Sequence, residues 1–233
     1  MSLLYLVTES DNDAWFYALC AEKLTGNSFE PVPLKNRKGD GVSAVKRQLR
    51  YALLGARAAA GGAGPVAFIA AVDNDRAPHD ENSAPPPTGT GLDRSMLMAA
   101  ERDRERRNNW MTDTVEGVLG QNRSAWPMAV ALAVPVEMIE AWIVRARREH
   151  PPQPTPHFSR ADSARARQYY APSEPPSQWK DLADDEQKRS GHSNVRDFYL
   201  DVVANLDANV LAGRSLSFRR FKEWLDGWPP RAP

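Results

Sequence analysis

The sequence has a single cysteine, Cys20, so no disulfide can form within its 233 residues. A reducing compartment is the default for such a chain, and we expect a cytoplasmic protein. No apolar run approaches the roughly 20 residues that a membrane-spanning helix needs. The first 15 residues contain no basic segment followed by an apolar stretch and a cleavage site. The sequence therefore predicts neither a membrane segment nor a signal peptide.

Other absences exclude particular kinds of binding site and surface. The chain has no G-x-x-x-x-G-K-[ST] motif, so we expect any ATPase that works with it to be a separate subunit. Its four histidines do not have the spacing of zinc ligands. The formal net charge is zero, which argues against a protein that is basic over its whole surface. Basic residues nevertheless cluster locally, and the cluster in the glycine-containing segment 35–41 is the one most difficult to explain as a solvated helix face.

Strand-like and helix-like segments alternate along the first 148 residues. Short apolar runs predict strands at 3–8, 28–34, 65–72 and 126–134. Between and after them, amphipathic segments predict helices at 11–25, 42–60, 93–119 and 135–148. This order predicts an α/β fold with a mainly parallel four-stranded sheet flanked by helices. The two prolines in 28–34 favour an edge position for that strand.

The chain changes character after residue 148. Residues 150–179 are rich in proline and predict irregular structure, and two short helices are expected at 193–208 and 216–226. We therefore predict an α/β domain over 1–148 and a helical C-terminal extension over 149–233 that packs on it. Residues 76–91 predict a loop between the third strand and the third helix.

Acidic side chains follow three of the predicted strands. Glu9 comes after the first strand, Asp73 and Asp75 after the third, and Glu140 in the helix after the fourth. Sites in open parallel sheets form at the carboxyl ends of the strands, so these carboxylates are expected to converge. Carboxylates that lie close together repel, and a hard divalent cation relieves the repulsion. The sequence therefore predicts a site for Mg²⁺ or Mn²⁺.

Basic residues stand near the same predicted edge. Lys35, Arg37 and Lys38 follow the second strand and Arg76 follows Asp75, where they are placed to bind phosphate groups of a substrate. Simpler interpretations remain open. Asp73 and Asp75 also fit turn chemistry, and Glu9 and Glu140 fit the first turn of a helix, which favours negative charge.

Two stretches resemble a known pattern, a strand ending in glutamate followed by a strand ending in D-x-D. "LLYLVTES" and "FIAAVDNDR" are similar to the Toprim domain of topoisomerases, primases and OLD-family nucleases. "VPVEMIEAWIV" and "SFRRFKEWL" resemble stand-alone Toprim-like proteins of bacterial phage-defence and mobile-element loci. The glutamate of the family usually has a neighbouring glycine, and here Ser10 follows Glu9.

The resemblance implies Mg²⁺-dependent phosphodiester chemistry on DNA or RNA. Glu9 would be the general acid/base or a metal ligand, Asp73 and Asp75 metal ligands, and Glu140 a further ligand or a supporting residue. Asp13 loosely matches an acidic position that often follows the glutamate of the family. No tyrosine can be assigned as a topoisomerase nucleophile and no primase zinc domain is evident, so a nuclease fits best.

Two other functions stay open. The first is a regulatory or scaffold subunit with a degenerate acidic pocket. Its expected partner is a separate ATPase or another defence-system subunit. The second is a small-molecule phosphohydrolase in which Asp73 is the nucleophile and Asp75 the acid. Enzymes of that kind usually carry D-x-D after the first strand, whereas here it follows the third.

Overall fold

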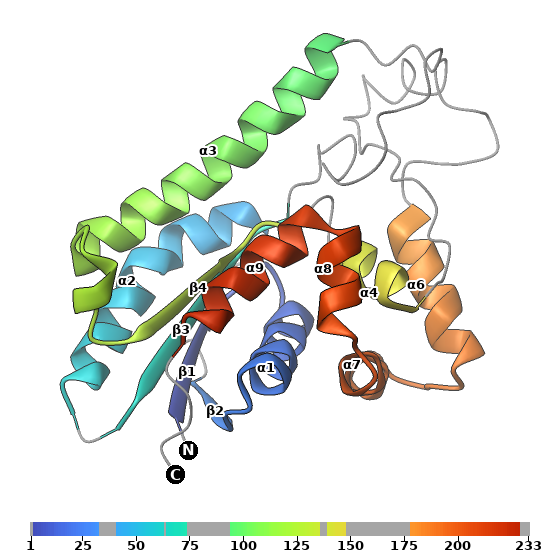
Figure 1. Ribbon diagram of the computed structural model, residues 1–233, viewed down its shortest axis with the longest axis horizontal. Coiled ribbons are helices and arrows are strands. Elements are labelled where there is room, and N and C mark those ends of the chain that lie inside the picture. Colours follow the sequence, from blue (N-terminus) through green and yellow to red (C-terminus); the bar gives the residue numbers. More distant parts are fainter. Residues whose placement is uncertain are drawn as a thin grey trace.

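A four-stranded sheet in which all strands are parallel forms the centre of the molecule (Figure 1). The computed structural model describes residues 2–32, 41–62, 64–73, 94–135, 139–147 and 178–228. The strands are β1 (Ser2–Val7), β2 (Phe29–Val32), β3 (Val66–Ala71) and β4 (Ala129–Ala133), in the order β2-β1-β3-β4. The predicted α/β class, the parallel sheet and the edge position of the second strand are confirmed.

Helices cover both faces of the sheet. On one face lie α2 (Val42–Ala60) and α3 (Arg94–Leu119), and on the other lie α1 (Asp11–Thr25), α7 (Val195–Ala204) and α9 (Leu216–Asp226) (Figure 1). The alternation of β3 explains this arrangement. Val66, Phe68 and Ala70 pack toward α2 and α3, while the residues between them pack toward α1. Because both faces of β3 are buried, its sequence is an unbroken apolar run.

Local signals set the bounds of the first two helices. Ser10 Oγ accepts a hydrogen bond from the backbone N–H of Asp13, and Asp13 Oδ2 accepts one from the N–H of Ser10, which makes a capping box at the start of α1. Gly26, with a φ of 67°, ends α1 in the left-handed conformation that glycine adopts readily. The predicted range of α2 agrees with the structure at both ends.

The C-terminal part contains more helices than the sequence predicted. The expected helix at 193–208 is two helices, α7 and α8 (Ala208–Arg214), because Asp207 accepts hydrogen bonds from two N–H groups and starts a new helix. The helix α6 (Gln178–Arg189) was not predicted, and it begins at the end of the segment expected to be irregular. The strand expected at 126–134 is shorter, and a 3-10 turn, η1 (Arg123–Ala125), precedes it.

Apolar side chains from both predicted domains pack in one cluster. Trp142 of α4 (Ile139–Arg147) lies between Tyr17 of α1 and the rings of Phe218 and Phe221 of α9. The C-terminal helices therefore complete the core on this face of the sheet, in agreement with the expectation that they pack on the α/β unit. The division at residue 148 itself stays a prediction, because the neighbouring residues lie outside the described ranges.

Cys20 lies on α1 with none of its surface exposed. Burial raises the pKa of its thiol, so the reactive thiolate is disfavoured at neutral pH. This agrees with the interpretation of Cys20 as a structural core residue. Among the described helices, none combines the length and the apolar character that crossing a membrane requires.

Candidate functional site

Glu9 and Asp73 meet at the carboxyl ends of two neighbouring strands. In the parallel pairing of β1 with β3, Val7 lies opposite Ala70, so the two chains leave the sheet side by side. The backbone N–H of Asp73 donates a hydrogen bond of 2.8 Å to Glu9 Oε1, although the residues are 64 positions apart. The expected proximity of the first and third acidic positions is therefore present, and both side chains are partly exposed.

The start of α2 lies against the same carboxylate. Gly41, the residue before α2, donates its backbone N–H to the carbonyl oxygen of Glu9 at 3.3 Å. A Cβ atom at position 41 would lie 3.6 Å from Glu9 Oε2, and the φ of Gly41 is +77°, a conformation that side chains with a Cβ rarely adopt. Glycine here allows the backbone to turn beside Glu9. The positive end of the α2 dipole then favours the charged form of the glutamate.

Glu140 lies on α4, the helix that follows β4. Its side chain is partly buried, and burial raises the pKa of its carboxyl to about 7. A hydrogen bond from its own backbone N–H and the charge of Lys180 lower the pKa of Glu140, whereas the negative charges of Asp13 and Asp184 raise it. Since β1, β3 and β4 are consecutive in the sheet, Glu140 follows the strand next to the one that precedes Asp73. That the Glu140 carboxylate joins those of Glu9 and Asp73 stays a prediction.

Two buried tyrosines lie within the electrostatic influence of these acidic residues. Burial and then the charges of Asp73, Asp13 and Glu9, with a contribution from Cys20, raise the pKa of Tyr17. Burial and then the charges of four carboxylates raise the pKa of Tyr199: Glu140, Asp13, Asp73 and Asp184. We use the name carboxylate cluster for the set Glu9, Asp13, Asp73, Glu140 and Asp184.

The hydroxyl of Tyr17 has no hydrogen-bond partner among the described residues, and its ring is almost fully buried. Such a group is costly to bury. The hydroxyl is therefore a buried polar group on which the charges of Asp73, Asp13 and Glu9 act.

Several predicted site residues cannot be placed. Asp75, Arg76, Lys35, Arg37 and Lys38 lie outside the described residues. Within the described ranges, no group of three or more histidine, cysteine, aspartate or glutamate side chains is placed to hold one metal ion. A three-carboxylate metal site therefore remains a prediction that depends on Asp75.

The sequence reasoning missed the contribution of α6. Asp184 and Lys180 lie one turn apart on α6, which packs on α4 and brings both charges near Glu140. The available signal was weak, since the segment is strongly polar and only Trp179, Leu182 and Ala183 are apolar at helical spacing. Asp13 was noted only as a loose match, and its carboxylate also closes the capping box of α1.

Replacing Glu140 by glutamine should stabilise the protein above neutral pH. The pKa of Glu140 is about 7 in the folded chain and 4.5 ordinarily, so between these values the folded state binds more protons than the unfolded state. Stability therefore falls as pH rises from 4.5 to 7, by about 3 kcal/mol at most. We expect Glu140→Gln to remove this loss at pH 8 and to change little at pH 4.5, as measured by urea unfolding in a chelator.

A matched control for this measurement is Glu186→Gln, which removes a carboxylate from the same helix pair. The Glu186 carboxylate lies 3.6 Å from the Arg189 guanidinium, so the control variant should not show the same pH-dependent gain. An equal effect of Glu140→Gln at both pH values would contradict the assignment of a raised pKa.

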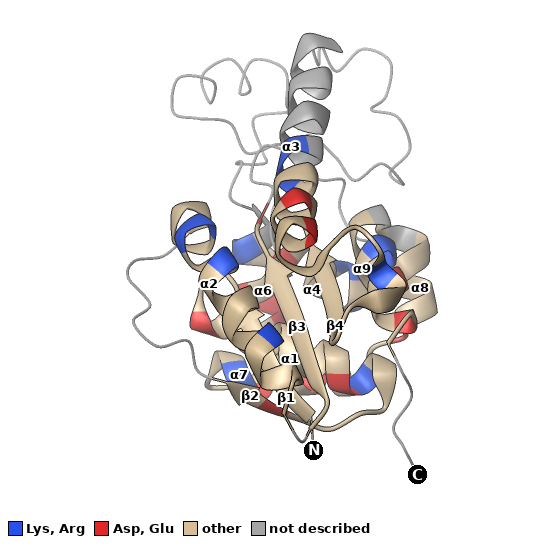
Figure 2. Cartoon of the chain, turned by 90° about the vertical axis from the view of Figure 1, so that its left-hand side faces the viewer, with Lys and Arg blue, Asp and Glu red and all other residues tan. Residues whose placement is uncertain are grey.

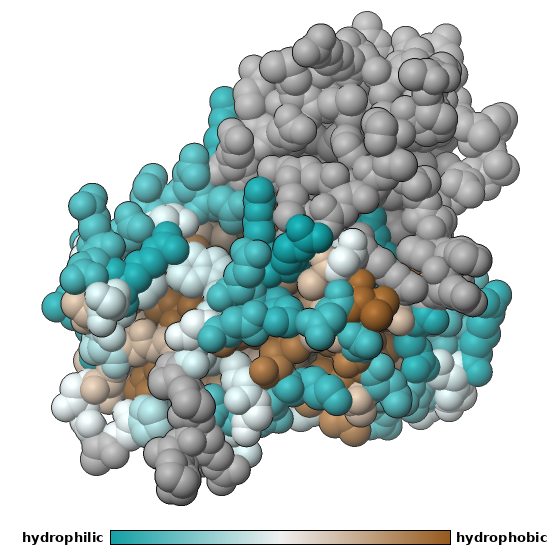
Figure 3. Space-filling view, in the orientation of Figure 1, coloured by the Kyte–Doolittle hydropathy of each residue, from teal (hydrophilic) through white to brown (hydrophobic). Residues whose placement is uncertain are grey.

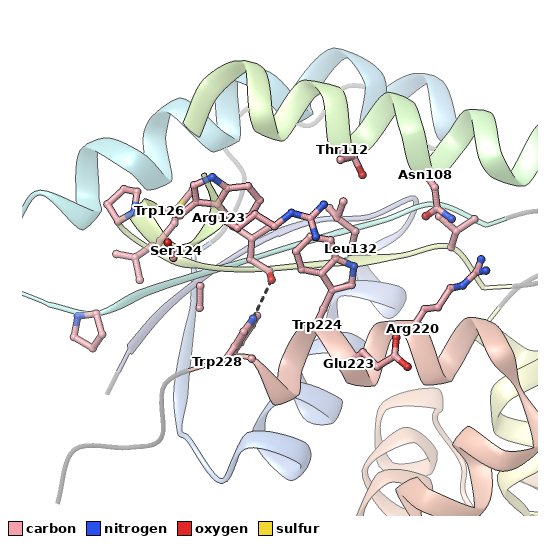
Figure 4. A pocket seen from close by; sticks show the side chains of 18 of the residues that line it. Asn108, Thr112, Arg123, Ser124, Trp126, Leu132, Arg220, Glu223, Trp224 and Trp228 are labelled. Atoms are coloured by element: carbon pink, nitrogen blue, oxygen red, sulfur yellow. Dashed lines mark hydrogen bonds between the residues drawn. The ribbon is translucent and has the colours of Figure 1, made fainter. Parts of the chain in front are cut away.

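A cavity of about 780 Å³ lies elsewhere, between α3 and α9 at the free edge of β4 (Figure 4). Its walls carry Trp126 and Trp224, whose rings are nearly parallel at 6.3 Å, and the Arg123 guanidinium lies 4.4 Å from the Trp224 ring centre. In the space-filling view, apolar atoms show in the hollow at the left, bordered by hydrophilic side chains (Figure 3). No residue of the carboxylate cluster lines this cavity. We therefore place the candidate site at the carboxylate cluster and not in the cavity.

Comparisons of this chain with protein-family models, with curated proteins and with solved structures found no match. The fold and the site together define an α/β protein in which Glu9 and Asp73 meet at the carboxyl ends of two neighbouring parallel strands. The resemblance to Toprim domains remains an interpretation of the sequence motifs.

Proposed function

We propose that this protein is a metal-dependent nuclease that hydrolyses phosphodiester bonds of DNA or RNA at the carboxylate cluster. The observation that carries the proposal is the junction of Glu9 with Asp73, in which Glu9 Oε1 accepts the N–H of Asp73 at 2.8 Å. The glutamate after one strand and the first aspartate of D-x-D after its neighbour are the two positions that the Toprim-like motifs require to be close. The same resemblance extends the proposal to a role in bacterial phage defence.

The donor set suits a hard cation. Mg²⁺ is usually bound through one or two carboxylates, with water and substrate phosphate completing the shell. Glu9 and Asp73 supply such a pair, and Asp75 and Glu140 are the further ligands that the sequence suggests. Burial is the main cause of the raised pKa values of Tyr17 and Tyr199, and the charges of neighbouring carboxylates add to it; that negative charge would favour cation binding.

Each residue then has a distinct task. Asp73 would hold the cation that, when bound, polarises a phosphoryl oxygen and stabilises the leaving oxygen. Glu9 is held by the N–H of Asp73 through one oxygen, and it would move a proton at the attacking or leaving oxygen through the other. Glu140, with a pKa near 7, would be drawn to its charged form when a cation lies beside it.

Cleavage assays with and without metal test the proposal. Purified protein is incubated with plasmid DNA, single-stranded DNA and tRNA in Mg²⁺, in Mn²⁺ and in chelator. We expect cleavage of at least one substrate that requires metal, and its loss in Asp73→Asn. Cleavage that persists in chelator or in Asp73→Asn would contradict the proposal.

The second candidate is a regulatory or scaffold subunit. The hydrogen bond between Glu9 and the Asp73 backbone joins the ends of β1 and β3, so it also fits a Glu9 that is purely structural. Absence of cleavage on every substrate, from protein shown to be folded, would favour this function.

A further inference from the structure

The exposed side of α2 is strongly basic. The helix carries four lysine and arginine residues and no aspartate or glutamate over its 19 residues, in a chain whose formal net charge is zero. Lys46, Arg47 and Arg50 are exposed. Tyr51 beside them is 77% exposed, which is unusual for a large aromatic ring. The charge on this helix is therefore local and on the surface.

Core packing does not require these side chains. Most apolar residues of α2, such as Val45 and Leu49, pack in the core against the sheet, and the opposite side, where Leu54 is 46% exposed, is left to solvent. Arg57, at the far end of the helix, is different, because its guanidinium donates to the carbonyl oxygen of Val118 and ties α2 to α3. We accordingly exclude Arg57 from the surface described next.

The neighbouring helix extends the same surface. Lys46 Nζ lies 5.6 Å from the ring centre of Trp110 on α3, and Arg106 precedes Trp110 by one helical turn. Arg106 is exposed as well. Figure 2 shows α2 with basic segments only, next to the lower part of α3. We use the name α2 surface for Lys46, Arg47, Arg50, Tyr51 and Arg106.

The α2 surface is connected to the carboxylate cluster. Gly41, directly before α2, contacts Glu9 through a backbone hydrogen bond, so the helix runs away from the proposed active site. At about 1.5 Å per residue, Lys46 and Arg50 are about 6 Å apart along the axis. Phosphates of one duplex strand follow each other at about 3.4 Å along the axis, so these basic residues can contact two or three phosphates.

We propose that the α2 surface binds the sugar–phosphate backbone of a nucleic acid and guides it to the carboxylate cluster. The partner is chosen by charge complementarity, since an exposed basic surface without acidic residues in its helix suits a polyanion. The exposed ring of Tyr51 adds a surface on which an unpaired base can stack. This inference rests on the proposed nuclease function for its direction toward Glu9, and its binding step is separable from cleavage.

Binding measured without metal tests the inference. Fluorescence anisotropy with labelled duplex DNA, single-stranded DNA and RNA is recorded in chelator over a range of salt concentrations. We expect Arg47→Ala/Arg50→Ala to bind on the order of 10-fold more weakly than wild type at about 0.1 M salt. The slope of log affinity against log salt should decrease by about 1.8 on duplex DNA or about 1.4 on single strands.

The matched control is Lys188→Ala/Arg196→Ala. It removes two exposed basic residues from α6 and α7, which lie on the other side of the sheet from α2, and should leave the slope unchanged. Thermal unfolding should show both double variants folded. Wild-type affinity and slope in Arg47→Ala/Arg50→Ala would overturn the inference, as would failure of the wild type to bind any nucleic acid, which would leave this surface to a protein partner.

Cleavage is scored separately. Binding that depends on α2, with no cleavage of any substrate in Mg²⁺, would refute the nuclease function while supporting the α2 surface. Metal-dependent cleavage with no effect of the α2 variants on binding would support the nuclease function and refute the role of the α2 surface.

Discussion

Glu9→Gln should remain folded but lose nearly all metal-dependent cleavage. The amide oxygen of glutamine can still accept the N–H of Asp73, which Glu9 Oε1 accepts at 2.8 Å, so the junction of β1 and β3 is kept. The amide carries no charge and takes up no proton at neutral pH, so both metal binding and proton transfer are lost. We expect a decrease of about 10²-fold to 10⁴-fold in the cleavage rate, measured under single-turnover conditions.

Glu9→Ala separates structure from chemistry at the same position. It removes the acceptor as well as the charge, and an N–H left without a partner costs about 1–3 kcal/mol of stability. The alanine variant should therefore be both inactive and less stable in urea, whereas the glutamine variant should be inactive and close to wild type in stability.

The chain contains a matched control for Glu9. Glu22 Oε1 accepts the backbone N–H of Phe29 at 3.0 Å, which is the same kind of contact at the start of β2, at the opposite edge of the sheet. Glu22→Gln should cleave at the wild-type rate. Full activity of Glu9→Gln would show that Glu9 only joins the strands, and would favour the regulatory or scaffold function.

Trp142→Ala should have the largest effect on folding, a loss of about 3–5 kcal/mol in the free energy of unfolding. The indole of Trp142 is fully buried, packs edge-on against Phe218 at 5.1 Å and nearly parallel to Phe221 at 5.7 Å, and donates to Ser217 Oγ at 2.9 Å. Truncation would leave a large cavity between α4 and α9. Urea unfolding monitored by circular dichroism measures the loss.

Trp126→Ala serves as the comparison for Trp142→Ala. Trp126 also stacks on a second tryptophan and donates its indole N–H, to the carbonyl oxygen of Gly120 at 2.8 Å, but it is partly exposed at the cavity beside β4. We expect Trp126→Ala to lower the free energy of unfolding by about 1–2 kcal/mol. If Trp142→Ala does not fold, Trp142→Phe allows the measurement. A cost for Trp142 no greater than that for Trp126 would contradict the central role of the aromatic cluster.

Most of the sheet and its first helices could be predicted because their signals are local. The capping box of Ser10 and Asp13, the terminating Gly26 and the unbroken apolar run of β3 each need only a few residues of context. Burial of β3 on both faces follows from that run alone. The alternation of strands and helices then leaves a parallel sheet as the simplest arrangement.

The C-terminal helices were harder because their signals are not local. α6 is polar along most of its length and gains its place from packing on α4, which no pattern within residues 178–189 reveals. The break between α7 and α8 depends on the side chain of Asp207 accepting two N–H groups, and aspartate has other common uses in a chain.

The sequence by itself determined which residue types stand at the carboxyl ends of β1 and β3, because Glu9 and Asp73 closely follow apolar runs. Only the tertiary structure decided that Glu9 contacts the backbone of Asp73, that Gly41 places α2 beside them, and that α6 brings Asp184 and Lys180 near Glu140. The physical reason is that strand order and helix packing fix these distances. Both depend on burial of apolar surface from segments far apart in the chain, which no short motif encodes.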